Sequence, residues 1–146
     1  MKRAILVALG TGAIITSAAA FSIGAAEDGG KVLNETQYTS RVRAIQAARA
    51  VQGDACATRG GFEREFCRIE ADGEHAVRLA DAEAAYKRTQ QSARAAQRAR
   101  IEARYQIERA KCGALGGFKR DKCLVQVHAT KGRAMLDAAA PYEVRF

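Results

Sequence analysis

The sequence predicts an all-α protein made of two disulfide-stapled helical hairpins. Alanine, the strongest helix former, is by far the commonest apolar residue, and Pro141 is the single proline. A loop of one design occurs twice, as CATRGGFEREFC at 56–67 and as CGALGGFKRDKC at 112–123. We expect three helices, one long central helix being shared by both hairpins in a Z-like arrangement or a short bundle.

The N-terminal residues 1–26 have the pattern of a secretory signal peptide. A basic start precedes an apolar run of 17 residues and two small-residue cleavage sites. We favour cleavage after Ala26, and an uncleaved membrane anchor is the alternative, although a span needs about 20 apolar residues. We therefore expect a mature helical domain at 27–146, located in the periplasm or secreted.

The mature chain has few large apolar residues with which to build a core. Ile, Leu, Val and Phe make up 20 of its 120 residues, or about 17%. A highly charged chain with less than roughly 20% of these residues is usually disordered. Alanine buries little surface. Cross-links must therefore hold much of the fold together.

Four cysteines in a short exported chain predict a disulfide framework. Three pairings are open, and we choose Cys56–Cys67 and Cys112–Cys123, because a glycine pair between the partners lets the chain reverse. The glycine pairs are Gly60-Gly61 and Gly116-Gly117. Each bridge closes a short loop and contributes about 3 kcal/mol.

Each glycine pair is followed by a phenylalanine, Phe62 or Phe118. These side chains are either exposed tips that insert into a partner or a membrane, or covers for their own disulfides. We favour the structural role, because both repeats share it and neither following helix starts with a Ser, Thr, Asn or Asp cap.

Three helices follow from the apolar spacing, at 32–57, 65–111 and 122–140. The middle helix would be about 70 Å long at 1.5 Å per residue. The outer helices together nearly equal it in length, so we expect them to fold back and meet near its centre.

The repeat extends beyond the loops at an offset of 56 residues, so that repeat 1 spans about 31–87 and repeat 2 about 88–143. Ala47 matches Ala103, and Val51 matches Ile107. Such a unit cannot bury its apolar face alone. Self-association or a partner protein is therefore compatible with the sequence.

The pattern resembles a group of small, Ala-rich exported proteobacterial proteins that are loosely described as cell-envelope biogenesis proteins. The resemblance covers about residues 41–142, and the residues that carry it are Cys56, Gly60, Cys67, Ala84, Tyr86, Lys87, Cys112, Gly116 and Cys123. That group has no established activity, so the resemblance implies compartment and fold. A weaker resemblance is to small helical periplasmic lysozyme inhibitors, whose Cys-to-Tyr spacing is not matched.

A basic stretch at 87–104 is the main indication of function. Its basic residues are Lys87, Arg88, Arg94, Arg98, Arg100 and Arg104, against the single acid Glu102. This region predicts an anionic partner: a lipid headgroup, lipopolysaccharide, a cell-wall polymer or an acidic protein. Export argues against nucleic acid, and ordinary solubility is the alternative explanation for the charge.

The residues form no catalytic motif, and we expect neither an enzyme nor a bound cofactor or metal. Ten residues between the cysteines of each pair do not fit the close ligand pairs of structural zinc sites. The sequence therefore predicts a non-catalytic protein with a structural or binding role at the envelope, and an inhibitor of a secreted hydrolase such as lysozyme is the alternative.

Overall fold

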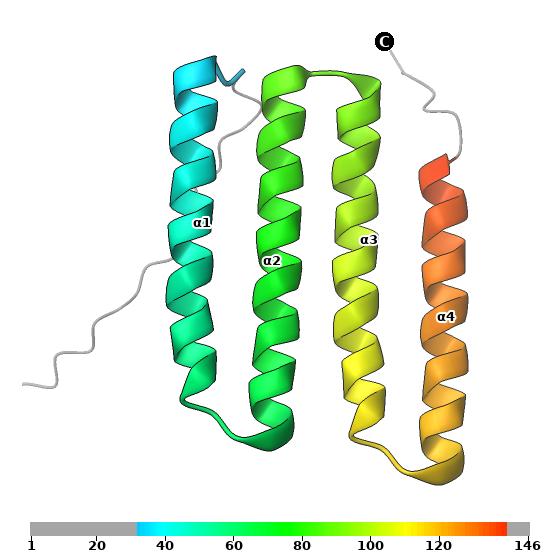
Figure 1. Cartoon of the computed structure of the whole chain (residues 1–146). Helices are drawn as coiled ribbons and strands as arrows, with labels where there is room; N and C mark the ends of the chain where they lie inside the picture. The colour runs from blue at the N-terminus through cyan, green and yellow to red at the C-terminus, as the bar shows by residue number, and fades with distance from the viewer. Residues whose placement is uncertain (1–31, 140–146) are drawn as a thin grey trace, which may run out of the picture.

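The computed structural model describes residues 32–139, and this part of the chain folds into four α-helices without strands. The helices are α1 (Glu35–Ala57), α2 (Gly61–Lys87), α3 (Gln90–Gly113) and α4 (Gly117–Ala139). Short connections make successive helices antiparallel, as Figure 1 shows. The expected all-α class and the two hairpins, α1–α2 and α3–α4, are confirmed.

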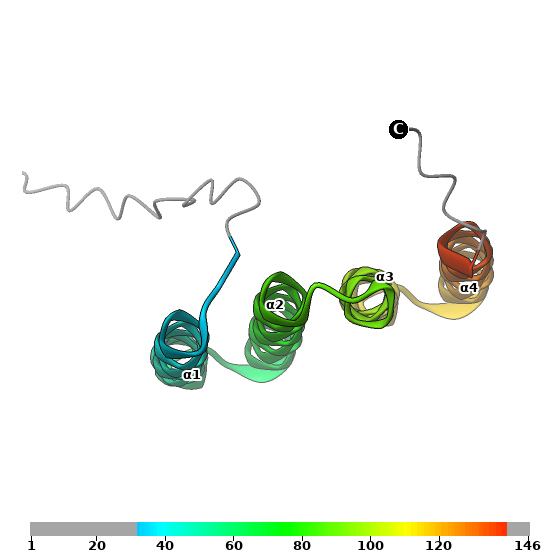
Figure 2. The ribbon, with the colours of Figure 1, turned by 90° about the horizontal axis from the view of Figure 1, so that it is seen from above.

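The four helices stand side by side in a single row instead of closing into a bundle. The views in Figures 1 and 2 agree on this order, and within the described residues only α1–α2, α2–α3 and α3–α4 are in contact. The expected Z-like arrangement is therefore wrong, and so is the expectation that the outer helices meet. They lie at opposite edges of the row.

The expected long central helix is also wrong, because it ends at Lys87 and a new helix begins at Gln90. Arg88 adopts a left-handed conformation with φ of 52°, which ends α2. Thr89 then caps α3: its hydroxyl oxygen accepts a hydrogen bond from the Ser92 N–H at 3.1 Å. The Ser92 hydroxyl accepts in turn from the Thr89 N–H at 3.2 Å. This reciprocal cap satisfies two backbone donors and stabilises the break.

The two stapled turns have the same backbone design. Gly61 and Gly117, the second glycine of each pair, have φ of +50° and begin α2 and α4. A side chain at these positions would strain the backbone. Both helices therefore begin closer to the glycines than the expected starts at 65 and 122.

The predicted disulfide pairing is confirmed. Cys56 bonds to Cys67 with a Cα–Cα distance of 5.5 Å, and Cys112 bonds to Cys123 at 5.7 Å. Each bridge joins the last turn of one helix to the second turn of the next. The 11-residue separation between the paired cysteines therefore spans a single tight turn between two antiparallel helices.

The three helix contacts use different chemistry. Between α1 and α2, the Tyr38 and Tyr86 rings stack with centroids 4.6 Å apart, and the buried Ile45 lies two turns further along the same side of α1. Between α2 and α3, small residues let the backbones approach: a Cβ atom on Gly73 would lie 3.1 Å from the Ala103 Cβ. No residue of α4 is fully buried. The apolar core is thus limited to narrow contacts between neighbouring helices, as the low content of large apolar residues predicts.

Two expectations fall outside the described residues. The signal peptide at 1–26 and the end of the last helix at Pro141 are not covered by residues 32–139.

Candidate anion-binding surface

The α2–α3 connection holds the first two residues of the predicted basic region. Lys87 ends α2 and donates a hydrogen bond to the Glu83 carboxylate at 2.5 Å, which raises the pKa of Lys87 above its ordinary value. Arg88 occupies the left-handed cap position, with its side chain exposed. These two cations therefore lie where the two central helices, α2 and α3, are joined, at the turn drawn at the top of Figure 1.

The other four residues of the predicted region lie on α3. Arg100 donates to the Asp81 carboxylate of α2 at 2.6 Å, so its charge is largely matched. Arg94, Arg98 and Arg104 are exposed and make no ion pair with any residue of 32–139. The predicted basic region therefore contains both paired and unpaired cations. Only the positive charge of the unpaired cations is not offset by a nearby carboxylate and can attract an anionic partner fully.

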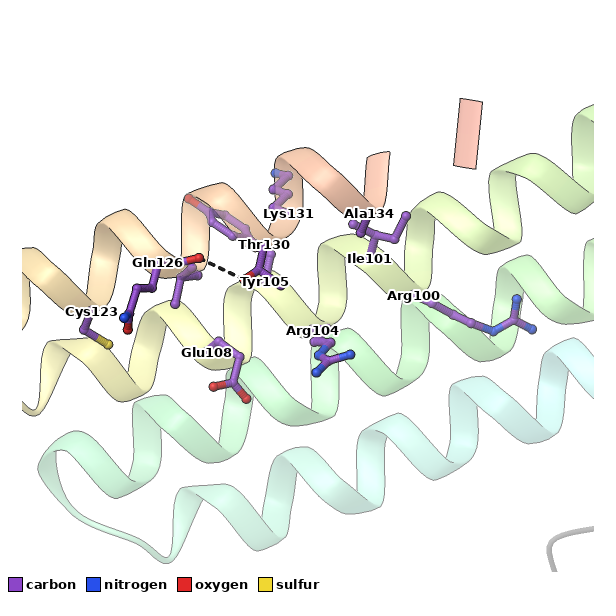
Figure 3. A pocket seen from close by; sticks show the side chains of 11 residues that line it. Arg100, Ile101, Arg104, Tyr105, Glu108, Cys123, Gln126, Thr130, Lys131 and Ala134 are labelled. Atoms are coloured by element: carbon purple, nitrogen blue, oxygen red, sulfur yellow. Dashed lines mark hydrogen bonds between the residues drawn. The ribbon is translucent and has the colours of Figure 1, made fainter. Parts of the chain in front are cut away.

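A groove of about 450 Å³ runs between α3 and α4. Its lining side chains come from both helices, as Figure 3 shows. Arg100, Arg104, Glu108 and Lys131 supply its charges, and Ile101, Tyr105, Val127 and Ala134 are among its apolar and aromatic lining residues. Two residues of the predicted basic region, Arg100 and Arg104, are thus brought to one opening.

Lys131 is committed to contacts within the protein. Its ammonium group lies 4.0 Å from the centroid of the Tyr105 ring and 2.5 Å from the Glu102 carboxylate. The hydrogen bond from Lys131, followed by one from Gln106, lowers the pKa of Glu102 below its usual range. The Tyr105 hydroxyl oxygen also lies 3.4 Å from the His128 ring nitrogen Nδ1. This polar cluster fastens α4 to α3.

The structure also shows how charge is divided between the two hairpins. The first hairpin, 32–87, contains eight Lys and Arg against nine Asp and Glu, a net charge of −1. The second, 88–139, contains twelve against four, a net charge of +8. The positive charge is therefore carried by the whole second hairpin, of which the predicted basic stretch is one part.

Sequence reasoning missed the basic residues of this hairpin beyond position 104. They are Arg109, Lys111, Lys119, Arg120, Lys122, Lys131 and Arg133. The stretch 87–104 has the densest cluster of basic residues, whereas the net charge of each repeat is the signal that shows the asymmetry. The repeat boundary near 87–88, which that signal requires, is apparent from the sequence.

The two turn phenylalanines differ in their surroundings. Phe62 stacks on Phe66 with centroids 5.8 Å apart and is 45% exposed. Phe118 is 81% exposed, so it covers its disulfide little. The expectation of one shared structural role is therefore wrong for Phe118, which belongs to an exposed apolar face of α4.

Three further findings concern chemistry and membranes. Both cysteine pairs are oxidised, so no thiol remains among the four cysteines. Among residues 32–139, no group of three His, Cys, Asp or Glu side chains is placed to hold a metal ion. Within the same range, no helix combines the length and apolarity that crossing a membrane requires.

No protein-family model, curated protein or solved structure matches this chain.

Proposed function

We propose that this protein is a non-catalytic component of the cell envelope that binds an extended anionic partner through its second hairpin. The observation that carries the proposal is the net charge of +8 on 88–139, next to −1 on 32–87. In a single row of helices both broad faces of α3 and α4 stay open, so this charge is available to a large partner.

An extended polyanion fits this surface better than a small ligand. The groove between α3 and α4 contains two cations that are already paired, Arg100 with Asp81 and Lys131 with Glu102. Glu108 in its lining is likewise paired, with Lys111, so Arg104 is the one charged lining residue without an ion pair among residues 32–139. The unpaired arginines are instead spread along α3, which suits a repeating array of charges such as a headgroup layer or a polymer.

The compartment is part of the same proposal. Disulfides form and persist in oxidising environments, and both bridges of this chain are structural staples of tight turns. An exported location makes anionic lipid headgroups, lipopolysaccharide and cell-wall polymer the partners of the right charge. An acidic envelope protein would share the same electrostatic attraction.

Inhibition of a secreted hydrolase such as lysozyme remains the alternative function. The second hairpin would repel a basic lysozyme. An inhibitory surface would therefore have to come from the first hairpin, and a lysis assay with excess protein would test it directly.

The proposal is tested by cosedimentation with vesicles across a salt series, using anionic phosphatidylglycerol vesicles, neutral phosphatidylcholine vesicles and purified sacculi. Binding should be confined to anionic surfaces and should weaken with salt, because the charges are exposed. Arg94→Gln/Arg98→Gln/Arg104→Gln should weaken it by up to about a hundredfold, since each surface cation contributes on the order of 1 kcal/mol.

A matched control removes the same charge from the first hairpin. Arg43, Arg59 and Arg68 are also exposed and form no ion pair within the described residues, so Arg43→Gln/Arg59→Gln/Arg68→Gln keeps the second hairpin intact. This variant should bind nearly as well as the original protein. Equal losses from both triple variants would show that only total charge matters, and negligible binding to every anionic surface would remove the proposed function.

A further inference from the structure

Helix α4 has an apolar face that no residue of 32–139 covers. The face consists of Phe118, Val125, Ala129, Gly132 and Leu136, all exposed and spaced on one side of the helix. Val125 is 68% exposed and Leu136 is 74% exposed. The opposite side of α4, which includes Val127 and Ala134, lines the groove with α3.

The internal repeat identifies what this face corresponds to. At the offset of 56 residues, Val125, Ala129 and Gly132 of α4 match Ile69, Gly73 and Ala76 of α2. The three α2 residues line the contact between α2 and α3, where Gly73 meets Ala103. The uncovered face of α4 is therefore the counterpart of the face that α2 uses to bind α3.

The other half of that interface has its counterpart at the opposite edge of the row. On α3, the contact with α2 is lined by Ala99, Ala103 and Gln106. Their counterparts on α1 are Arg43, Ala47 and Ala50, and that of Ile107 is Val51; all four α1 residues are exposed. Both edges of the row thus repeat the two sides of a contact that already exists inside the molecule.

We propose that α4 of one copy of this chain packs against α1 of a second copy, in the manner of α2 on α3. The row of hairpins would then continue from molecule to molecule. Ala129 of one copy would face Ala47 of the next, at the position of the Gly73–Ala103 contact. Ala129 has the Cβ that Gly73 lacks, so the two helices would lie a few tenths of an ångström further apart than α2 and α3 do. Because the two edges differ, this head-to-tail contact leaves a free edge at each end and allows assemblies larger than a dimer.

Charge favours this pairing over the symmetric one. Packing α4 against α4 would bring together two hairpins that each carry +8, whereas the head-to-tail contact places +8 beside −1. Like-charge juxtaposition disfavours the symmetric contact and so selects the asymmetric one. The inference depends on the repeat and not on the binding of an anionic partner.

The test uses the oxidised protein and measures its mass by sedimentation at increasing concentration. The mass of the original protein should rise beyond that of a dimer. Val125→Glu/Leu136→Glu blocks the α4 edge, and Ala47→Glu/Val51→Glu blocks the α1 edge. Each variant alone should remain monomeric, because a free edge finds no complementary one.

Mixing the two blocked variants gives the decisive result. One retains a free α1 edge and the other a free α4 edge, so the mixture should form a 1:1 dimer and nothing larger. Gln91→Glu/Gln97→Glu adds the same negative charge to exposed positions of α3 and should assemble like the original protein. Helical circular dichroism checks that every variant is folded.

Three outcomes would overturn the proposal. The first is that the original protein stays monomeric at every concentration. The second is that an edge-blocked variant assembles normally. The third is that the α1-blocked variant forms dimers by itself, which would indicate a symmetric α4–α4 contact. Loss of vesicle binding with intact assembly would instead reject only the anionic partner.

Discussion

Gly73 sets the distance between the two central helices. Any side chain there would meet Ala103, whose Cβ would be 3.1 Å from the added Cβ atom. Gly132 of α4 also lies in the middle of a helix, but it differs from Gly73 because a Cβ atom added to it would meet nothing within 4 Å. The same residue type therefore has a packing role on α2 and no packing role within a single copy on α4.

Replacing these two glycines by leucine should have opposite effects on stability. Gly73→Leu should lower the free energy of unfolding by about 1–3 kcal/mol, because it overfills the α2–α3 contact. Gly132→Leu should be neutral or stabilising by up to about 1 kcal/mol, because leucine favours helix over glycine. Urea unfolding at low protein concentration measures both, and equal effects would contradict the assigned contact.

At the scale of elements, the break at Arg88-Thr89 decides how many helices the chain has. Residues 65–111 contain no proline and a single glycine, Gly73, which is why one long helix is expected from the sequence. Capping by Thr89 and Ser92 and the left-handed Arg88 end one helix and start the next. The signal was present, because a repeated helix–turn–helix unit needs a connection at its boundary, which the repeat places near 87–88.

Substitutions at the two connection residues should move stability in opposite directions. Thr89→Ala removes a cap and should cost about 1 kcal/mol. Arg88→Gly relieves the left-handed conformation of a non-glycine residue and should stabilise by roughly 1 kcal/mol. Thermal unfolding of both variants checks this, and a destabilising Arg88→Gly would argue for one continuous helix.

At the scale of the whole molecule, a row of helices has no common core. Each edge helix depends on a single neighbour and on its disulfide. Helix α1 has the buried Ile45 and the Tyr38–Tyr86 stack, whereas α4 has no fully buried residue. Stability should therefore differ along the row, as in other repeat proteins.

Removing each disulfide in turn should reveal this difference in stability between α1 and α4. Each double replacement of cysteines by alanine should cost about 3 kcal/mol. In Cys112→Ala/Cys123→Ala, fast hydrogen exchange should be concentrated in α4, while 35–113 stays protected. In Cys56→Ala/Cys67→Ala, α1 should retain more protection than α4 does in the first variant. Uniform loss of protection in both would indicate a single cooperative unit.

The sequence by itself determined the features that depend on short-range spacing. The glycine pairs, the pairing of Cys56 with Cys67 and of Cys112 with Cys123, and the two hairpins follow from residues within a dozen positions of each other. Only the tertiary structure decided that α2 packs on two sides while α1 and α4 pack on one. Alanine-rich helices present small side chains all round, so their sequence does not select one packing face. The arrangement is settled by local caps and by where glycine and alanine let two backbones approach.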